Sequence, residues 1–334
     1  MSRLFLYFFF AFFLLSFDQP SGFRKIQIDG LAQGTTYHIV YYASDTVVYK
    51  RQVDSILDKI DSSLSLYKSY SLINQFNYSR DGVIPDEHFR KVIKKAIEVY
   101  HHTNGLFDIT VEPLTTAWGF GPVKTTTLPD STTIRNILPC VNTTLLYWKK
   151  KKLKKRKPCV RLDANGIAQG YSVDVLADFF ESKGLKNYVI ELGGEIRAKG
   201  HKYPGKEKMK IGIETPGDDP EFSLIEKVVW LDKGAITTSG NYRRYYESNG
   251  KKITHLLNPK TGYSLQNELI SVTVYAKDAI TADGYDNALM VMGLNKAIEF
   301  VEKRKDMAAH FIYQKKDGTI ADTMTKRFVV LLKP

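Results

Sequence analysis

The amino-acid sequence predicts an α+β fold, and two observations favour it over a doubly wound α/β sheet. Segments with helical periodicity and short β-branched or aromatic runs are both present, but predicted strands and helices do not alternate regularly along the chain. The second half is richer in strand-like runs. The 334 residues, of which 43% are hydrophobic, are enough for one large domain or two closely packed lobes. Average glycine, proline and charge contents exclude disordered, collagenous and coiled-coil classes.

The same patterns predict the elements in order along the chain. In the first half we expect a strand at 35–42, helices at 47–64, 86–103 and 172–183, and a strand at 188–192. The second of these helices is expected to end at Asn104 and Gly105, residue types that commonly follow a helix C-terminus. In the second half we expect helices at 282–292 and 296–303, and strands at 208–214, 227–231, 269–276, 310–313 and 327–332.

The N-terminal segment is expected to lie outside the fold. An apolar run at 4–17 follows Arg3 and precedes Pro20, which is the pattern of a signal-peptide core. The run is short for a transmembrane helix of about 20 residues, and no cysteine for lipid attachment occurs in the N-terminal third of the chain. We therefore expect residues 1–21 to be a signal peptide or a short membrane anchor, and residues 22–334 to form the exported body.

The net charge of +12 is concentrated in one segment. Residues 149–157 carry eight positive charges in nine positions, which leaves the remainder of the chain with a net charge of only +4. No basic face therefore extends over the fold, which argues against a nucleic-acid binding protein. We expect residues 145–160 to form a basic hairpin or loop insertion that faces solvent or a membrane surface.

The chain has two cysteines, Cys140 and Cys159, and they flank the basic segment. In an exported protein they can form a disulfide at the base of a hairpin, and two free thiols are an equally consistent arrangement. Neither cysteine has neighbours that indicate catalysis or zinc binding.

Two glycine-containing turns offer candidate ligand-binding groups. The first follows the helix stop at Gly105 and contains Asp108, which is either a turn former or an acceptor of hydrogen bonds from a ligand. The second, residues 162–171, contains Gly166 and Gly170 just before a helix, where free backbone amides favour anionic groups such as phosphate. A structural turn that binds nothing is an equally good interpretation of the second segment.

Two further clusters supply hydroxyl, imidazole and carboxylate groups. Three consecutive hydroxyl side chains occur at 237–239, and His255 further on is either a general base for a hydroxyl nucleophile or a structural histidine. Asp283, Asp286 and Asn287 are spaced i, i+3 and i+4, so their oxygens share one face of a helix. A few hard oxygen ligands suit Mg²⁺, and carboxylates near a helix N-terminus also serve as dipole partners.

Together and in this order, the four clusters resemble the motifs of the ApbE family of FAD:protein FMN transferases. The resemblance extends from Gly34 to the C-terminal segment, and it implies a T-fold-like α+β core with a smaller α/β lobe. It also implies Mg²⁺ as cofactor and FAD as substrate, with FMN moved through a phosphoester bond onto a Thr or Ser hydroxyl of an exported acceptor flavoprotein and AMP released. Family acceptors include subunits of membrane redox pumps, which implies a periplasmic location at the outer face of the inner membrane.

The resemblance further implies roles for individual residues. It implies FAD contacts at Tyr67, Leu106, Phe107, Asp108, Asp163, Gln169 and Leu257. It implies a base at His255 and metal ligands at Gly166 (through its carbonyl oxygen), Asp283, Asp286 and Asn287. Two positions depart from the family pattern: Gln169 stands where Lys or Glu is usual, and Asn287 replaces the usual Thr. Because an amide oxygen is still a hard ligand, we expect Mg²⁺ binding to be kept.

Two other functions are compatible with the same residues. A Mg²⁺-dependent FAD pyrophosphatase would use water in place of the protein hydroxyl and would produce FMN and AMP. A non-catalytic exported FAD-binding protein would bind without turnover, and the intact acidic face at Asp283 argues against it. Residues 1–21 and 149–157 are the segments through which the chain could contact a membrane surface, and no nucleic-acid partner is expected.

Overall fold

A computed structural model describes residues 22–123, 125, 127–214, 225–242, 245–248 and 251–334. The expected signal peptide or anchor at 1–21 lies outside these residues. Within them, no helix combines the length and the apolar character that a membrane-spanning helix needs.

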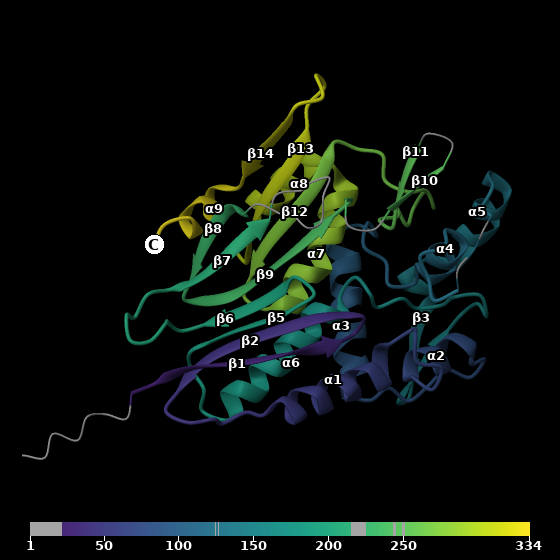
Figure 1. The fold of residues 1–334 in the computed structure, drawn as a ribbon. Helices are drawn as coiled ribbons and strands as arrows, with labels where there is room; N and C mark the ends of the chain where they lie inside the picture. The colour runs from purple at the N-terminus through teal and green to yellow at the C-terminus, as the bar shows by residue number, and fades with distance from the viewer. Residues whose placement is uncertain (1–21, 124, 126, 215–224, 243–244, 249–250) are drawn as a thin grey trace, which may run out of the picture.

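An eight-stranded antiparallel sheet forms the centre of the molecule (Figure 1). Its spatial order is β1-β2-β5-β6-β9-β12-β13-β14, so the N-terminal and C-terminal hairpins form its two edges. The bounds are β1 Arg24–Ala32, β2 Thr35–Ala43, β5 Tyr188–Leu192, β6 Glu195–Lys199, β9 Lys233–Gly240, β12 Leu269–Ala276, β13 Met307–Gln314 and β14 Ile320–Met324.

Helices cover one face of this sheet, and a hairpin with a short helix covers the other (Figure 1). The helical layer contains α1 Lys50–Leu64, α3 Glu87–His102, α6 Ala168–Ser182, α7 Ala279–Met292 and α8 Leu294–Glu302. The opposite layer contains β7 Met209–Glu214, β8 Ile225–Leu231 and α9 Lys326–Leu331. Apolar side chains between these layers and the sheet form the main core, because each element buries one face.

A smaller lobe of short helices and hairpins lies beside the helical layer (Figure 1). Its elements are α2 Leu72–Tyr78, α4 Glu112–Ala117, α5 Ser131–Ile137, the 3₁₀ turns Leu138–Cys140 and Thr143–Leu145, and the hairpins β3 Leu146–Lys149 with β4 Lys152–Lys155 and β10 Tyr245–Ser248 with β11 Lys251–Thr254. Part of the lobe has its own apolar cluster around Leu114, Trp118 and Leu257. The predicted α+β class is confirmed, and the basic run forms the β3–β4 hairpin.

The C-terminal segment is a helix, α9, and the expectation of a strand at 327–332 is wrong. Val329 and Val330 give the segment its strand-like composition, but both side chains are exposed. Phe328 is fully buried against the sheet, and the leucine three residues later packs against the same cluster. That spacing buries one face of a helix, so tertiary contacts decide the conformation of this segment.

Other differences concern elements that the sequence patterns did not predict and the bounds of those that they did. Strand β1 was not predicted, because it is an edge strand with mostly exposed side chains and therefore a weak hydrophobic pattern. Helix α6 begins at Ala168 rather than at residue 172, which places Gln169 and Gly170 in its first turn. The hydroxyl cluster at 237–239 lies within β9, in the middle of the sheet.

Cys140 and Cys159 form a disulfide, with their Cα atoms 5.6 Å apart and 19 positions apart in the sequence. The bond joins the 3₁₀ turn after α5 to the segment after β4, so the basic hairpin lies inside the loop that it closes. Of the two arrangements that the sequence allowed, the structure shows the bonded one.

Replacement of both cysteines by serine should lower the free energy of unfolding by about 3 kcal/mol, because a bond that closes a loop of this length restricts the unfolded chain by about that amount. Denaturant unfolding with and without reductant measures the effect. Reductant should destabilise the wild-type protein and leave the double variant unchanged; an equal response of both proteins would contradict the stabilising role of the bond.

Candidate active site

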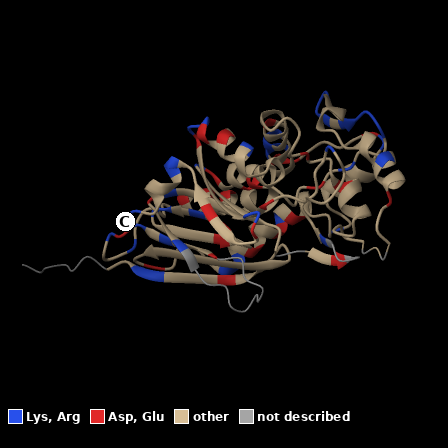
Figure 2. Ribbon diagram, turned by 90° about the horizontal axis from the view of Figure 1, so that it is seen from above, with Lys and Arg blue, Asp and Glu red and all other residues tan. Residues whose placement is uncertain are grey.

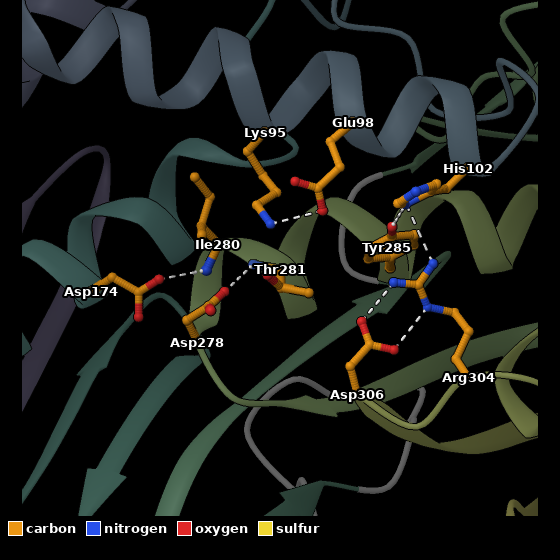
Figure 3. A network of polar contacts seen from close by, with 10 residues as sticks. All are labelled: Lys95, Glu98, His102, Asp174, Asp278, Ile280, Thr281, Tyr285, Arg304 and Asp306. Carbon is orange, nitrogen blue, oxygen red and sulfur yellow. Dashed lines mark hydrogen bonds and ion pairs between the residues drawn. The ribbon is translucent and has the colours of Figure 1, made fainter.

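Helix α7 carries the three residues that the sequence groups as oxygen ligands, and its N-terminus is held by two carboxylates (Figure 3). Asp278 is the N-cap and accepts a hydrogen bond from the Thr281 backbone N–H at 3.1 Å. Asp174, which comes from α6, accepts from the backbone N–H groups of Ala279 and Ile280 at 2.9 and 2.8 Å. The start of α7 is therefore fixed both locally and by the neighbouring helix.

The opposite face of α7 is fixed by an aromatic and ionic cluster (Figure 3). The hydroxyl of Tyr285 lies 2.6 Å from His102 Nδ1, and the Arg304 guanidinium lies 4.6 Å from the centroid of the Tyr285 ring. Arg304 is itself paired with Asp306 at 2.6 Å. These contacts set the rotation of α7 about its axis, because Tyr285 lies about 200° around the helix from residues 283 and 287.

The side chains of Asp283, Asp286 and Asn287 all bond to neighbouring elements. Asp283 Oδ2 accepts a hydrogen bond from the Gly170 backbone N–H at 2.8 Å. On β9, the Thr237 hydroxyl donates to Asp286 Oδ2 at 2.8 Å and the Ser239 hydroxyl donates to Asn287 Oδ1 at 3.0 Å. The oxygen-bearing face of α7 thus lies between the start of α6 and one face of β9.

Gly166 completes this group. A side-chain carbon at Gly166 would lie 3.1 Å from Asn287 Nδ2 and 3.7 Å from the ring of Phe107. The structure therefore brings the four residues expected to bind metal, namely Gly166, Asp283, Asp286 and Asn287, to one place, and Phe107 borders them.

Burial dominates the electrostatics of the two carboxylates. It raises the pKa of Asp283 to about 7, and the charge of Asp174 adds to this shift, while the Gly170 N–H opposes it. It also raises the pKa of Asp286 well above its ordinary value, and the charge of Asp283 raises it further. In the absence of a cation, both carboxyl groups therefore keep their proton to a higher pH than an exposed aspartate does.

The donor set fits a hard divalent cation. Asp286 Oδ1 is buried and has no hydrogen-bond partner among the described residues. An unpaired buried acceptor lowers the stability of the fold unless a ligand binds it. Among those same residues, no three His, Cys, Asp or Glu side chains cluster in a way that would hold a metal. Two carboxylates supplemented by amide or carbonyl oxygen suit Mg²⁺, which keeps water or phosphate oxygens in its remaining positions.

The residues expected to contact FAD are more widely distributed. Asp108 is buried and accepts four hydrogen bonds, from the backbone N–H and the hydroxyl of both Thr110 and Thr143, at 2.6 to 3.1 Å. Its carboxylate holds the 105–108 loop rigid, and it borders a cavity of about 230 Å³ that Tyr100, Asn142 and Lys260 also line. Leu106, at the same loop, is half-buried.

Asp163 is buried in the second turn. Its Oδ1 accepts from the Asn165 backbone N–H at 2.9 Å, and its Oδ2 accepts from the Thr115 hydroxyl at 3.0 Å. The amide nitrogen of Gln169 is directed toward the β5–β6 turn, 2.8 Å from where a side-chain carbon on Gly193 would lie. These residues order the approach to the start of α6.

The other three residues predicted to belong to the site form none of the hydrogen bonds to α7 given above. Tyr67 is exposed in the turn after α1. Leu257 is buried in the apolar cluster of the smaller lobe, and His255 lies just after β11 with its ring centroid 6.3 Å from that of Phe120. The lobe thus contributes His255 from a different layer than the carboxylates.

Sequence reasoning did not assign roles to Thr237, Ser239 and Asp174. The two hydroxyls are two positions apart on β9, a spacing that places them on one face of a strand and is the pattern that identifies them. Asp174 has no such pattern, because its partners at the start of α7 are more than a hundred residues away.

Comparison with known proteins agrees with this architecture. The ApbE family model matches residues 33–311. FAD:protein FMN transferases of Haemophilus influenzae and Vibrio cholerae are 35% and 33% identical, over 89% and 84% of this chain and 89% and 85% of theirs.

Solved structures give the same result. The flavin transferase ApbE from Vibrio cholerae has a TM-score of 0.83 at 30% identity and covers 93% of this chain and 100% of its own. The apo flavinyl transferase ApbE of Pseudomonas stutzeri has a TM-score of 0.83 at 31% identity, with 93% and 98% covered. The chain is thus an enzyme of the transferase class. It belongs to the ApbE family.

Asp286→Asn should make the metal-free protein more stable at pH 8 than the wild type. A carboxyl group with a raised pKa favours the folded state while it is protonated, so the free energy of unfolding falls as pH rises toward and through the raised values, about 7 for Asp283. The variant removes one buried charge and its repulsion of Asp283. Melting temperatures in EDTA at pH 5 and pH 8 measure the effect.

The wild type should lose more stability between the two pH values than Asp286→Asn does. Asp317→Asn is the matched control, because Asp317 is an exposed carboxylate in the β13–β14 turn whose pKa is lowered by its bonds to Thr319. Equal pH slopes for the wild type and Asp286→Asn would show that the buried pair carries no such cost.

Proposed function

We propose that the protein is a Mg²⁺-dependent FAD:protein FMN transferase, which moves FMN from FAD onto a Thr or Ser hydroxyl of an acceptor flavoprotein and releases AMP. The observation that carries the proposal is the pair of buried carboxylates on α7. One of them has an oxygen without a hydrogen-bond partner among the described residues, and the other accepts the Gly170 N–H at the start of α6. FAD as the substrate is supported by the relatives, which are named FAD:protein FMN transferases.

Asp283, Asp286, Asn287 and the backbone carbonyl of Gly166 are the groups that would hold the cation. When bound there, Mg²⁺ would polarise the phosphoryl group and neutralise charge on the pyrophosphate. The N-terminus of the 15-residue helix α6 lies beside these groups, because its Gly170 N–H donates to Asp283, and the positive end of the helix dipole favours an anionic group there.

In the proposed reaction the acceptor hydroxyl oxygen forms a bond to the phosphorus of the FMN half of FAD. The bond between that phosphorus and the bridging oxygen breaks, and AMP leaves with the bridging oxygen. His255 takes the hydroxyl proton in this scheme, a role suited to an imidazole near neutral pH. The rigid 105–108 loop, fixed through Asp108, orients the flavin end.

In this proposal the protein is exported, and it acts in the periplasm on an exported acceptor such as a redox-pump subunit. Two features support it: the apolar run at 4–17 has the pattern of a signal-peptide core, and the Cys140–Cys159 disulfide is typical of an oxidising compartment. Fractionation of cells that produce the full chain tests this part directly.

Asp283→Ala should abolish transfer. It removes a carboxylate from the cation group and the acceptor for the Gly170 N–H, and loss of several kcal/mol of charge stabilisation corresponds to a rate loss of at least about 100-fold. The assay incubates the protein with FAD, Mg²⁺ and an acceptor domain that carries a flavinylation Thr, and follows AMP release and covalent flavin fluorescence.

Acceptor-dependent fluorescence together with AMP supports the transferase. AMP without labelled acceptor would indicate a pyrophosphatase, and FAD binding without either product would indicate a carrier. Asp317→Ala is the control for the loss of a carboxylate at an exposed site. A fully active Asp283→Ala protein would refute the metal role.

His255→Ala should slow transfer far more than it weakens FAD binding, because a general base acts on the proton in the transition state and contributes about 100- to 10,000-fold. His201→Ala is the matched control, since His201 is exposed and its described hydrogen bond uses its backbone N–H. Transfer rates and FAD titrations are measured for both. Parallel losses of rate and affinity in His255→Ala would contradict the base role and indicate a binding role instead.

A further inference from the structure

The β3–β4 hairpin presents a concentrated positive charge that the proposed reaction does not use. A two-residue turn, Lys150 and Lys151, joins its two strands. The lysines that flank this turn, Lys149 and Lys152, are paired across the hairpin. All four side chains are exposed. Residues 149–152 are called the basic tip below.

The rest of the basic run is already occupied by contacts within the protein. The amine of Lys155 is buried and donates to the backbone carbonyls of Asn77 and Val160. Lys154 approaches Asp81 at 4.0 Å, and Lys157 donates to the Pro139 carbonyl at 2.9 Å. The stem of the hairpin is therefore built into the lobe, whereas the tip is not.

No carboxylate of the described chain lies within ion-pair distance of the four tip lysines. Elsewhere on the molecule, basic and acidic residues are interspersed along the ribbon, as Figure 2 shows. Four like charges on adjacent residues repel one another, so the tip raises the local positive potential at an electrostatic cost to the hairpin.

The backbone conformation of the turn is also unfavourable for lysine. Lys150 has a φ of +56°, in the left-handed region where two-residue hairpin turns normally carry Asn or Gly. A lysine there costs roughly 1 kcal/mol relative to glycine. The lysine at this position is thus unfavourable for the turn, so the turn geometry does not explain its presence.

Exposed apolar side chains lie next to the tip. Trp148, the neighbour of Lys149, is 45% exposed, and its register partner Leu153 pairs in turn with Val83. Ile84, which follows Val83 on that flanking segment, is 59% exposed. An amphipathic ring and an aliphatic side chain beside a group of lysines is the composition of surfaces that lie at the boundary between headgroups and acyl chains.

We propose that the basic tip, with Trp148 and Ile84, binds the surface of a membrane that contains anionic phospholipids. Lysines present compact point charges on flexible stems, which suits a fluid layer of phosphate headgroups and not a single arranged carboxylate. The disulfide and the buried amine of Lys155 hold the stem, so the tip is presented on a rigid base. The proposal is independent of the flavin chemistry.

Co-sedimentation of the full chain with vesicles tests it. One set contains phosphatidylcholine alone, and the other contains phosphatidylcholine mixed with phosphatidylglycerol, so any contribution of residues 1–21 common to both sets cancels in the ratio. The wild type should prefer the anionic vesicles, and the preference should fall with added salt. Each lysine near an anionic surface is worth about 1 kcal/mol, so serine at all four tip positions should lower the preference roughly 100- to 1000-fold.

The matched control replaces four exposed lysines outside the hairpin, Lys305, Lys315, Lys316 and Lys333, by serine and so removes the same net charge. Equal losses in the two variants, or a wild type with no anionic preference, would overturn the proposal. So would binding of the tip to poly-glutamate or DNA in the absence of lipid binding, which would assign a different partner.

Tryptophan emission provides a second measurement. Emission should shift to shorter wavelength when the wild type binds anionic vesicles, because Trp148 leaves water. Trp148→Phe should keep binding and lose this shift, since the chain has only two other tryptophans and Trp118 is already buried. A shift that persists in Trp148→Phe would show that the hairpin is not the membrane contact.

Discussion

The close contact between α6 and α7 is the interaction on which the site depends. A side-chain carbon on Gly170 would lie 2.4 Å from the Ala279 carbonyl oxygen and 2.7 Å from Asp283 Cβ, so a larger residue would force the helices apart. At this distance the Gly170 N–H reaches Asp283, and one turn along α6 the Asp174 carboxylate reaches the first amides of α7. Two points of contact fix the helices in register as well as in distance.

That register allows α7 to carry an unfavourable face. The residues that stabilise the helix, among them Ala282, Tyr285 and Leu289, are fully buried in the core. They allow Asp283 and Asp286 to be buried close together, an arrangement that lowers stability unless a cation or a proton compensates it. The buried apolar side chains thus stabilise the helix that carries the two destabilising carboxylates, a combination that is common at functional sites.

The sequence predicts features that depend on local periodicity. It does not predict contacts between elements that are far apart in the chain. Asp283, Asp286 and Asn287 could be grouped because helical spacing alone puts them on one face. The pairing of Thr237 and Ser239 with that face could not be predicted, because it requires knowing that α7 crosses β9. The same limit explains α9, where the burial of Phe328 against the sheet outweighs a strand-like composition.

The disulfide links the smaller lobe to the site through short stretches of chain. Three residues after Cys140 comes Thr143, which donates two hydrogen bonds to Asp108, and four residues after Cys159 comes Asp163. Order at the 105–108 loop and at the turn before α6 therefore depends on the same bond. The hairpin between the two cysteines contributes its stem to this structure through Lys155, whereas none of the four tip lysines forms an ion pair with the described residues, so the tip's charge can vary without disturbing the site. The charge of the tip can therefore change without altering the order of the 105–108 loop, because the hydrogen bonds that join the hairpin to the described part of the lobe come from its stem.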